Sequence, residues 1–309
     1  MNIEHFPKQK NCKNNTLVPS YVLVTPARNE AAFIEQTIQS VIHQKILPVR
    51  WIIVSDGSND GTDEIVERYA LRFPWIGLVK MPPRAERDFG GKARAFKAAY
   101  EKLNKMHYDI IANLDADITF DEDYFYYLLK KFVEYPNLGV AGAPFRQGNF
   151  QYNYQFSRKE HVSGACQLFR RECYESIGGY VPIKEGGIDL AAVVTARMKG
   201  WKTETFSEKY CIHNRSMGKA GSHLIKYFFM SGVGDYRMGV HPLWQFFRSI
   251  YQMSHSPIFL SGFLHLAGYF WAMIIRAPKP VSRDFVHFRK KEQMGWLKEY
   301  YKKALALLE

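Results

Sequence analysis

Short apolar runs alternate with longer amphipathic segments from residue 21 to residue 143 of this 309-residue chain. The apolar runs are rich in Val, Ile and Leu, as in strands that are buried on both faces. The segments between them repeat their apolar residues every three or four positions, which is typical of helices. Strands are therefore expected at residues 21–25, 51–55, 76–80, 108–114 and 138–141, and helices at residues 31–44, 60–72, 93–103 and 121–135. This order predicts an α/β fold with a parallel sheet covered by helices on both faces.

The pattern changes after residue 143. The next segment is less regular, with one clear helix at residues 190–199, and from residue 222 onward the chain is helical and strongly aromatic. We therefore expect a flexible N-terminal arm, one large domain made of two halves, and a helical C-terminal region. Their predicted bounds are residues 1–19 for the arm, 20–220 for the domain with halves 20–143 and 144–220, and 221–309 for the C-terminal region.

Residues 257–275 are nearly uncharged, and six basic residues follow them before residue 292. A helix that spans a bilayer needs roughly 20 apolar residues, so this stretch is borderline, and its Ser, His and Gly residues weaken a spanning interpretation. An interfacial or re-entrant helix beside a basic patch suits anionic lipid head groups. The alternatives are an aromatic core helix or an oligomer contact. We expect the C-terminal region to contact a membrane surface.

The net charge of +12 indicates an anionic partner. Nucleic acid, an anionic membrane or a phosphorylated substrate would each explain it. Because the sequence holds no helix-turn-helix, zinc finger or aromatic-basic RNA-binding motif, no nucleic-acid partner is expected. The four cysteines form no CxxC pair, and residues 1–19 lack the apolar stretch of a signal peptide. These features predict a cytoplasmic protein at the inner face of the membrane.

Asp115, Ala116 and Asp117 follow directly after the predicted strand at residues 108–114. Two carboxylates one residue apart, where a buried strand stops, offer a hard oxygen site for Mg²⁺ or Mn²⁺. In an open α/β sheet, ligands bind at this carboxyl edge of the strands. The alternative is an ordinary turn, in which Asp is also common.

Two more polar loops are expected at the same edge, at residues 25–30 and 54–61. Asp56 could accept a hydrogen bond from a nucleotide base, and Glu30 could bind a ribose hydroxyl. The glycines of the second loop would let a planar base approach the backbone. The alternative is a pair of ordinary strand-to-helix loops with capping residues.

Four basic residues lie on or beside the third loop, at residues 82–92. Their guanidinium and ammonium groups could screen a diphosphate, and Arg is suited to bidentate contact. A solvated charged loop is the alternative. These residues are Arg84, Arg87, Lys92 and Arg94.

Taken together, these motifs closely resemble the nucleotide-sugar half of the inverting family 2 glycosyltransferases, which have the GT-A fold. The motifs are Thr25-Pro-Ala-Arg-Asn-Glu30, Val54-Ser-Asp-Gly-Ser-Asn-Asp-Gly-Thr62 and Leu114-Asp-Ala-Asp117. Gly178-Gly179-Tyr180, Gly187-Ile-Asp-Leu190 and Ala196-Arg-Met-Lys-Gly-Trp201 resemble the acceptor half of that family. The resemblance covers about residues 20–220 and implies a Rossmann-like, nucleotide-sugar-binding sheet.

The resemblance also implies roles for the matching positions. Asp189 would be the general base, and His213 would complete a metal site with Asp115 and Asp117. A histidine among oxygen ligands would favour Mn²⁺ over Mg²⁺. The residues expected to contact the nucleotide sugar are Pro26, Arg28, Glu30, Val54, Asp56, Lys92, Asp115 and Ala116. For Asp189 a solvent-facing helix cap is the alternative, and for His213 an ordinary structural or exposed histidine.

Two departures from the family pattern bear on the substrate. Ile188 stands where the family has the Glu of a Glu-Asp pair, so the wall of the acceptor site differs. The Gln-x-x-Arg-Trp box of processive polysaccharide synthases is missing, since Gln245-Phe-Phe-Arg-Ser249 lacks its Trp. With at most one membrane segment there is no room for a polymer channel. Single sugar additions are therefore expected.

These observations predict a metal-dependent, inverting glycosyltransferase that uses Mn²⁺ or Mg²⁺. It would move a sugar from a nucleotide sugar, with a uridine rather than a guanosine nucleotide, to a hydroxyl of a glycan or lipid-linked acceptor. The first alternative is a polyprenyl-phosphate sugar synthase, which would need no general base. A sugar nucleotidyltransferase would carry a Gly-rich phosphate loop after the first strand, and a non-catalytic scaffold would not need its three aspartates. The sugar, the linkage and the oligomeric state stay open.

Overall fold

The computed structural model describes residues 18–83, 90–147, 150–151, 158–215, 221–254 and 257–306. The chain divides into two compact units. The first comprises Met1–Lys184 and Ile188–Ser216, and the second comprises Glu185–Gly187 and Met217–Glu309. The first unit contains the sheets, and the second is helical.

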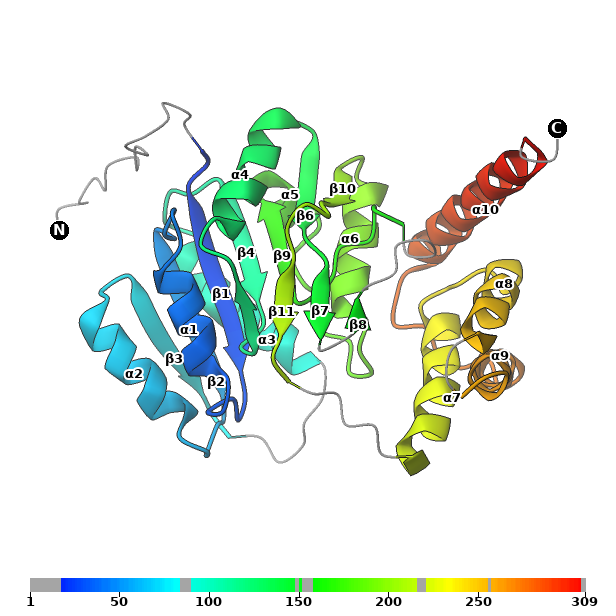
Figure 1. Ribbon diagram of the computed structural model, residues 1–309, viewed down its shortest axis with the longest axis horizontal. Helices are drawn as coiled ribbons and strands as arrows, with labels where there is room; N and C mark the ends of the chain where they lie inside the picture. The colour runs from blue at the N-terminus through cyan, green and yellow to red at the C-terminus, as the bar shows by residue number, and fades with distance from the viewer. Residues whose placement is uncertain are drawn as a thin grey trace. The chain divides into compact units, whose positions relative to one another are not determined.

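A seven-stranded sheet is the centre of the first unit (Figure 1). The four strands β3, β2, β1 and β4 lie side by side and parallel, so their carboxyl ends meet at one edge. The strands in spatial order are β10 (Lys202–Thr205), β6 (Leu138–Gly142), β9 (Cys166–Arg170), β4 (Ile110–Leu114), β1 (Tyr21–Ala27), β2 (Arg50–Asp56) and β3 (Ile76–Met81).

Helices cover both faces of this sheet, and Figure 1 shows α3 behind the strands with α1 and α2 in front of them. Alternate residues of β1, such as Tyr21 and Leu23, pack in one core with Ile34 and Ile38 of α1, because side chains alternate between the faces of a strand. The helices of this unit are α1 (Ile34–Ile42), α2 (Thr62–Arg72), α3 (Gly90–Leu103), α4 (Tyr124–Glu134), α5 (Arg171–Ser176) and α6 (Ile188–Met198).

The expectation of an entirely parallel sheet is wrong. β9 lies between β4 and β6 and runs antiparallel to both, so the sheet is mixed. β9 comes from the irregular segment after residue 143, and its second residue, Gln167, is polar but fully buried. Hydrogen bonds to Tyr180 Oη (2.6 Å) and the Val162 carbonyl (2.9 Å) satisfy the amide. A buried Gln hides the apolar pattern by which a central strand is recognised.

A second, smaller sheet brings distant parts of the chain beside the Asp115–Asp117 motif. Its strands are ordered β5 (Ile118–Phe120), β11 (Cys211–His213), β7 (Phe145–Gln147) and β8 (Phe150–Gln151). β11 pairs antiparallel with β5, and His213 lies opposite Ile118. This pairing places the residues that follow His213 next to Asp117.

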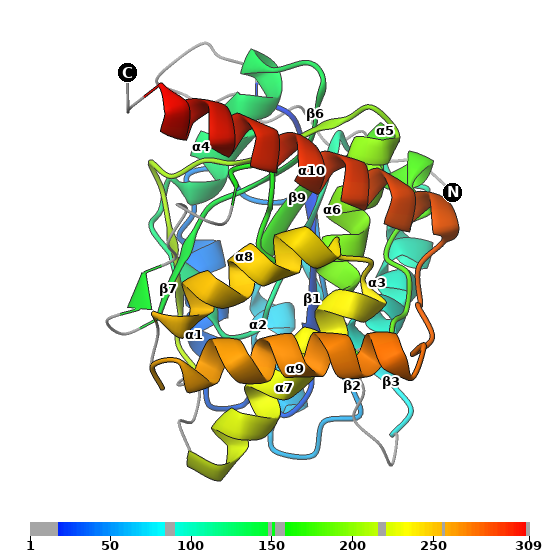
Figure 2. The same ribbon diagram turned by 90° about the vertical axis from the view of Figure 1, so that its right-hand side faces the viewer.

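The second unit contains four helices along its described residues: α7 (Gly221–Arg237), α8 (Pro242–Met253), α9 (Leu260–Ile274) and α10 (Arg283–Leu305). α9 packs against α7 and α8, and Figure 2 shows these helices together with α10. Across the described residues, none of the helices combines the length and the apolar character that crossing a bilayer requires.

Truncation of Phe125 tests the core between α4 and the sheet. Phe125 is fully buried and stacks on Tyr21 with ring centroids 4.9 Å apart. F125A should lower the free energy of unfolding by about 3–5 kcal/mol, because it removes a large apolar side chain and leaves a cavity. Urea unfolding followed by tryptophan fluorescence measures this change. V133A on the exposed side of the same helix should shift it by less than about 0.5 kcal/mol. Equal effects of the two changes would contradict this packing.

Candidate active site

The loops that follow β1, β2 and β4 lie at one edge of the large sheet. In the register of the parallel strands, Ala27 pairs with Ser55, and Val24 pairs with Asn113. Residues just after β1, β2 and β4 therefore emerge at the same edge, where open α/β sheets bind their ligands. Pro26 and Val54 are direct neighbours across β1 and β2. The prediction that the loops share an edge is confirmed.

Hydrogen bonds lock the first two loops together. Asn29 has a left-handed backbone (φ 56°), and its side-chain oxygen accepts from the Asn59 N–H at 2.9 Å. The Glu30 N–H donates to Thr62 Oγ1 at 2.8 Å, and the Ala31 N–H donates to Asp60 Oδ2 at 3.0 Å. Polar residues that could have been simple caps thus fix one loop against the other. Next to this contact, Arg28 Nη1 lies 3.8 Å from Asp56 Oδ2.

Lys92 connects the end of β4 with the beginning of α6. Its ammonium lies 2.8 Å from Asp115 Oδ1 and 3.2 Å from Asp189 Oδ1, and it donates to the Gly164 carbonyl at 2.8 Å. Burial works against the ammonium, but the two carboxylates outweigh it and raise the pKa of Lys92. Both carboxylates therefore meet one cation that remains charged.

The pKa of the Asp115 carboxyl group is subject to opposing influences. Burial raises the pKa of its carboxyl group to about 6, the Lys92 ammonium works against that rise, and the neighbouring carboxylates of Asp189 and Asp117 add to it. Its backbone N–H donates to the Ala165 carbonyl at 2.9 Å, which ties the loop after β4 to the segment before β9.

Asp189 lies in the first turn of α6 and close against the backbone of Gly164. A Cβ atom at residue 164 would lie 2.1 Å from Asp189 Oδ2, so only a glycine permits this approach. The side chain of Asp189 is 29% exposed. It is directed to Lys92, whereas a helix cap would point to its own backbone. Asp189 can therefore be reached by a substrate while one of its oxygens is held.

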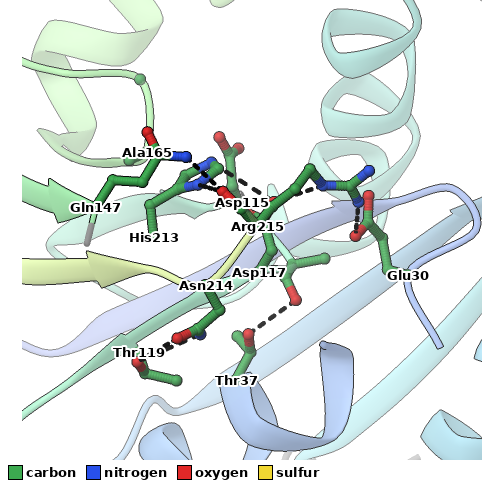
Figure 3. Close-up of polar contacts among 12 residues, drawn as sticks. Glu30, Thr37, Asp115, Asp117, Thr119, Gln147, Ala165, His213, Asn214 and Arg215 are labelled. Atoms are coloured by element: carbon green, nitrogen blue, oxygen red, sulfur yellow. Dashed lines mark hydrogen bonds and ion pairs between the residues drawn. The ribbon is translucent and has the colours of Figure 1, made fainter. Parts of the chain in front are cut away.

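Asp117 is surrounded by a separate group of side chains (Figure 3). Arg215 Nε donates to Asp117 Oδ2 at 3.1 Å, and the same guanidinium forms an ion pair with Glu30. His213 Nε2 lies 3.5 Å from Asp117 Oδ2. Glu30 and Asp117 are both buried, so Arg215 neutralises two carboxylates that would otherwise repel each other.

Comparisons with known proteins identify the family. Residues 22–184 match the model of glycosyl transferase family 2. The chain belongs to this family. The predicted family and the predicted GT-A-type α/β fold are thereby confirmed, and the protein is a glycosyltransferase.

Among curated relatives, the poly-β-1,6-N-acetyl-D-glucosamine synthase of Staphylococcus aureus (strain COL) is 32% identical over 117 residues, which are 38% of this chain and 26% of that protein. The probable glycosyltransferase YdaM of Bacillus subtilis (strain 168) is 28% identical over 145 residues, 46% of this chain and 33% of that protein. The match thus spans about a quarter to a third of the length of these relatives.

Two solved structures share the fold at low identity. The mannosyltransferase PcManGT from Pyrobaculum calidifontis, in complex with GDP-Man and Mn²⁺, has a TM-score of 0.57 and 20% identity over 94% of this chain and 81% of its own. Residues 1–349 of S. aureus TarS, in complex with UDP-GlcNAc, have a TM-score of 0.53 and 12% identity over 87% of this chain and 78% of that chain.

The residues of the glycosyltransferase that could hold a divalent cation are only partly assembled. Asp117 Oδ2 and His213 Nε2 are 3.5 Å apart. Two ligands of one cation, each about 2 Å from it, are about 3 Å apart, so these two atoms could bind the same cation. Asp115 instead contacts Lys92. Within the described ranges no three or more His, Cys, Asp or Glu residues form a group that could hold a metal. The carboxylate–imidazole pair suits Mn²⁺, but Arg215 holds the carboxylate of Asp117 in this structure.

The structure changes the interpretation of the basic residues of the third loop. Lys92 and Arg94 belong to the first turns of α3, because the helix begins at Gly90. Lys92 contacts Asp115 and Asp189. Arg84 and Arg87 lie outside the described residues.

Arg215 and Gly164 are site residues that sequence reasoning missed. Arg215 follows the predicted metal ligand His213 by two positions, just beyond the end of β11, so its position in the sequence could have pointed to it. Its partners Glu30 and Asp117 are distant in sequence. For Gly164 no local pattern gives a signal, since its role depends on the approach of α6.

Removal of Arg215 should expose the repulsion between Glu30 and Asp117. R215A should lower the free energy of unfolding by about 1–3 kcal/mol in the presence of a chelator, because two buried carboxylates lose their cation. Thermal unfolding measures this effect, and added Mn²⁺ should restore part of the stability if it binds these carboxylates.

R68A is the matched control. Arg68 lies 3.7 Å from Glu35, both side chains are exposed, and such pairs contribute little. If R215A and the wild type unfolded at the same midpoint temperature, both with and without Mn²⁺, the role given to Arg215 would be contradicted.

Proposed function

We propose that this glycosyltransferase transfers a sugar, with inversion, from a nucleotide sugar to a hydroxyl group of a glycan or lipid-linked acceptor, and that it needs Mn²⁺ or Mg²⁺. The observation that carries the proposal is the contact of Lys92 with Asp115 and Asp189. It places a carboxylate of the loop after β4, on the expected donor side, beside a partly exposed carboxylate of α6, on the expected acceptor side.

The donor would bind along the edge formed by the loops after β1, β2 and β4. Asp56 and Glu30 can accept hydrogen bonds from the base and the ribose, and the interlocked loops would hold them without further ordering on binding. The solved relatives were bound to GDP-Man and to UDP-GlcNAc, so the fold accommodates both nucleotides. We retain a uridine nucleotide as the proposed donor.

The leaving diphosphate gains negative charge as the glycosidic bond breaks. A divalent cation held by Asp117 and His213, with Asp115 beside them, would neutralise part of this charge. Arg215 lies at the same place and now pairs with two carboxylates. A guanidinium binds phosphate oxygens with the same bidentate geometry, so Arg215 is suited to contact the diphosphate as well.

Asp189 is the proposed general base. The acceptor oxygen forms a bond to the anomeric carbon while the bond from that carbon to the diphosphate oxygen breaks, and the hydroxyl proton passes to the Asp189 carboxylate. Inversion requires the acceptor to attack from the face opposite the diphosphate. The Lys92 ammonium lies 3.2 Å from Asp189 Oδ1 and holds the carboxylate in place.

The same ammonium is the observation that favours a second candidate. A polyprenyl-phosphate sugar synthase has a phosphate acceptor that is already ionised, and Lys92 lies where it could attract such an anion. That reaction would not depend on proton transfer to Asp189, which makes the two candidates distinguishable.

Replacement of Asp189 by Asn tests the base. D189N should lower the rate of transfer to a hydroxyl acceptor by about 10²–10⁴-fold, because the amide cannot take the proton. Binding of the nucleotide sugar, measured by calorimetry across a panel that includes uridine and guanosine donors, should remain near the wild-type value. Turnover of D189N at the wild-type rate would remove the base assignment and favour a phosphate acceptor.

Two further variants separate chemistry from structure. G164A should lower the transfer rate as well, since the added methyl group displaces the side chain of Asp189. G295A on α10 is the matched control, because nothing lies within 4 Å of the new Cβ atom. Donor binding should be retained in both.

Metal removal tests the cation. Treatment with a chelator should abolish transfer, Mn²⁺ should restore it at least as well as Mg²⁺, and D117N should raise the Mn²⁺ concentration needed for half-maximal activity by about tenfold or more. D121N, which changes an exposed carboxylate a few residues away, should leave the requirement unchanged. Full activity in the chelator would show that the enzyme is metal-independent.

A further inference from the structure

The helix α8 exposes its apolar side and buries its polar side. Leu243, Phe246, Phe247 and Ile250 follow the spacing of one helical face, and each is between 44% and 49% exposed. Gln245 and Ser249 lie on another face and are fully buried. A surface helix of a globular protein in water shows the opposite arrangement, with its apolar stripe toward the core.

The neighbouring helix α9 is inverted in the same way. Phe263, Trp271 and Ile274 are 62%, 53% and 73% exposed. The buried positions of this helix carry mainly small or polar residues, namely Ser261, Gly262, His265, Gly268, Tyr269 and Ala272. α7 adds the exposed residues Ile225, Tyr227 and Met230. Three consecutive helices thus direct large apolar side chains outward.

A cluster of hydrogen-bonded polar side chains lies in the interior between these helices. Asp235 of α7 accepts from Arg248 Nη1 at 2.9 Å and lies 2.8 Å from His265 Nε2. Ser249 Oγ is 3.3 Å from His265 Nδ1 on the other side of the ring. Burial alone would raise the pKa of Asp235, but Arg248 and His265 outweigh it and lower the pKa. The charged carboxylate therefore links all three helices.

Glycines let the helix backbones approach closely around this cluster. A Cβ atom on Gly232 would lie 1.9 Å from the His265 carbonyl oxygen, one on Gly262 would lie 2.1 Å from that of Ser249, and one on Gly268 would lie 2.0 Å from that of Phe229. Small residues at helix contacts, and polar side chains joining helices, are the means of packing where the surroundings are as apolar as the side chains.

The positive charge of the C-terminal third of the chain indicates which kind of apolar surroundings these helices contact. Residues 217–309 contain thirteen Lys and Arg against five Asp and Glu, so this third of the chain carries +8 of the net +12. Lys226 on α7 and Arg276, just after α9, are exposed beside the apolar side chains. A second copy docking through a two-fold axis would bring two such units together and oppose like charges. Anionic lipid head groups would neutralise them.

From this inverted packing and this charge we infer that α7, α8 and α9 form a module that lies in the interface of an anionic lipid bilayer. Phe246, Ile250, Phe263 and Trp271 enter the boundary between head groups and acyl chains, and Lys226 and Arg276 contact the head groups. α9 has 15 residues and is therefore about 22 Å long. The hydrocarbon core is about 30 Å thick, so α9 lies within one leaflet. The inference does not depend on the proposed donor or acceptor.

Flotation with lipid vesicles tests this inference on the full chain. The protein should float with vesicles of phosphatidylcholine that contain about 30% phosphatidylglycerol, and about tenfold less with phosphatidylcholine alone. The double variant F246S/I250S should lower the bound fraction by about tenfold or more, because both side chains lose their place in the acyl region. K226Q/R276Q should lower binding to the anionic vesicles by about tenfold and make it less sensitive to salt.

L71S is the matched control, because Leu71 is an 86% exposed apolar residue on α2 of the first unit. It should float like the wild type, and circular dichroism should show all variants to be folded. Failure of the wild type to float with anionic vesicles would overturn the inference. A second result would also overturn it: a dimer, seen by light scattering, that F246S/I250S dissociates, together with no binding to vesicles. The exposed apolar side chains would then be covered by a second copy of the chain. Loss of donor turnover alone would bear on the proposed function and leave this result intact.

Discussion

The candidate active site depends on one largely buried ammonium group. Lys92 contacts Asp115, Asp189 and the Gly164 carbonyl, and these partners come from three separate parts of the chain. Without this cation, two carboxylates would face each other at short range, and one of them would have to move away or bind a proton. The same ion network therefore fixes the position of α6 against the end of β4 and brings the two carboxylates together. Structure and chemistry rest on the same contact.

Much of the first unit could be predicted because its signals are local. Apolar residues dominate the runs at β1, β2, β3 and β4, and the polar motifs after β1, β2 and β4 indicate a common edge. β9 escaped prediction because it is short, lies in an irregular part of the sequence, and has its apolar character interrupted by Gln167. The role of Lys92 also escaped, since Asp189 is close to it in space and nearly a hundred residues away in sequence. Contacts of this kind depend on tertiary packing, which no spacing rule reports.

The second unit shows the same limit in another form. Its aromatic, uncharged character is plain in the sequence, but the sequence does not say which face of a helix is buried. In α8 the apolar and polar stripes are equally clear, and a reader who assumes an aqueous environment assigns the apolar stripe to the core. The buried cluster around Asp235 and the glycine contacts reverse that assignment. A membrane-facing module would also place the glycosyltransferase unit near lipid-linked acceptors, which joins the two proposals without making either depend on the other.

The pairing of β5 with β11 has a consequence for how this site can vary. His213 and Arg215 face Asp117 only because β11 keeps one register against the strand that directly follows the Asp115–Asp117 motif. A single-residue insertion or deletion in β11 would turn alternate side chains to the opposite face. Asp117 would lose both His213 and Arg215 as neighbours in one step, even though neither residue had been substituted. Length changes are therefore tolerated far less here than in the surface loops of the same unit, and grafts between relatives should preserve the distance from the sheet to Arg215.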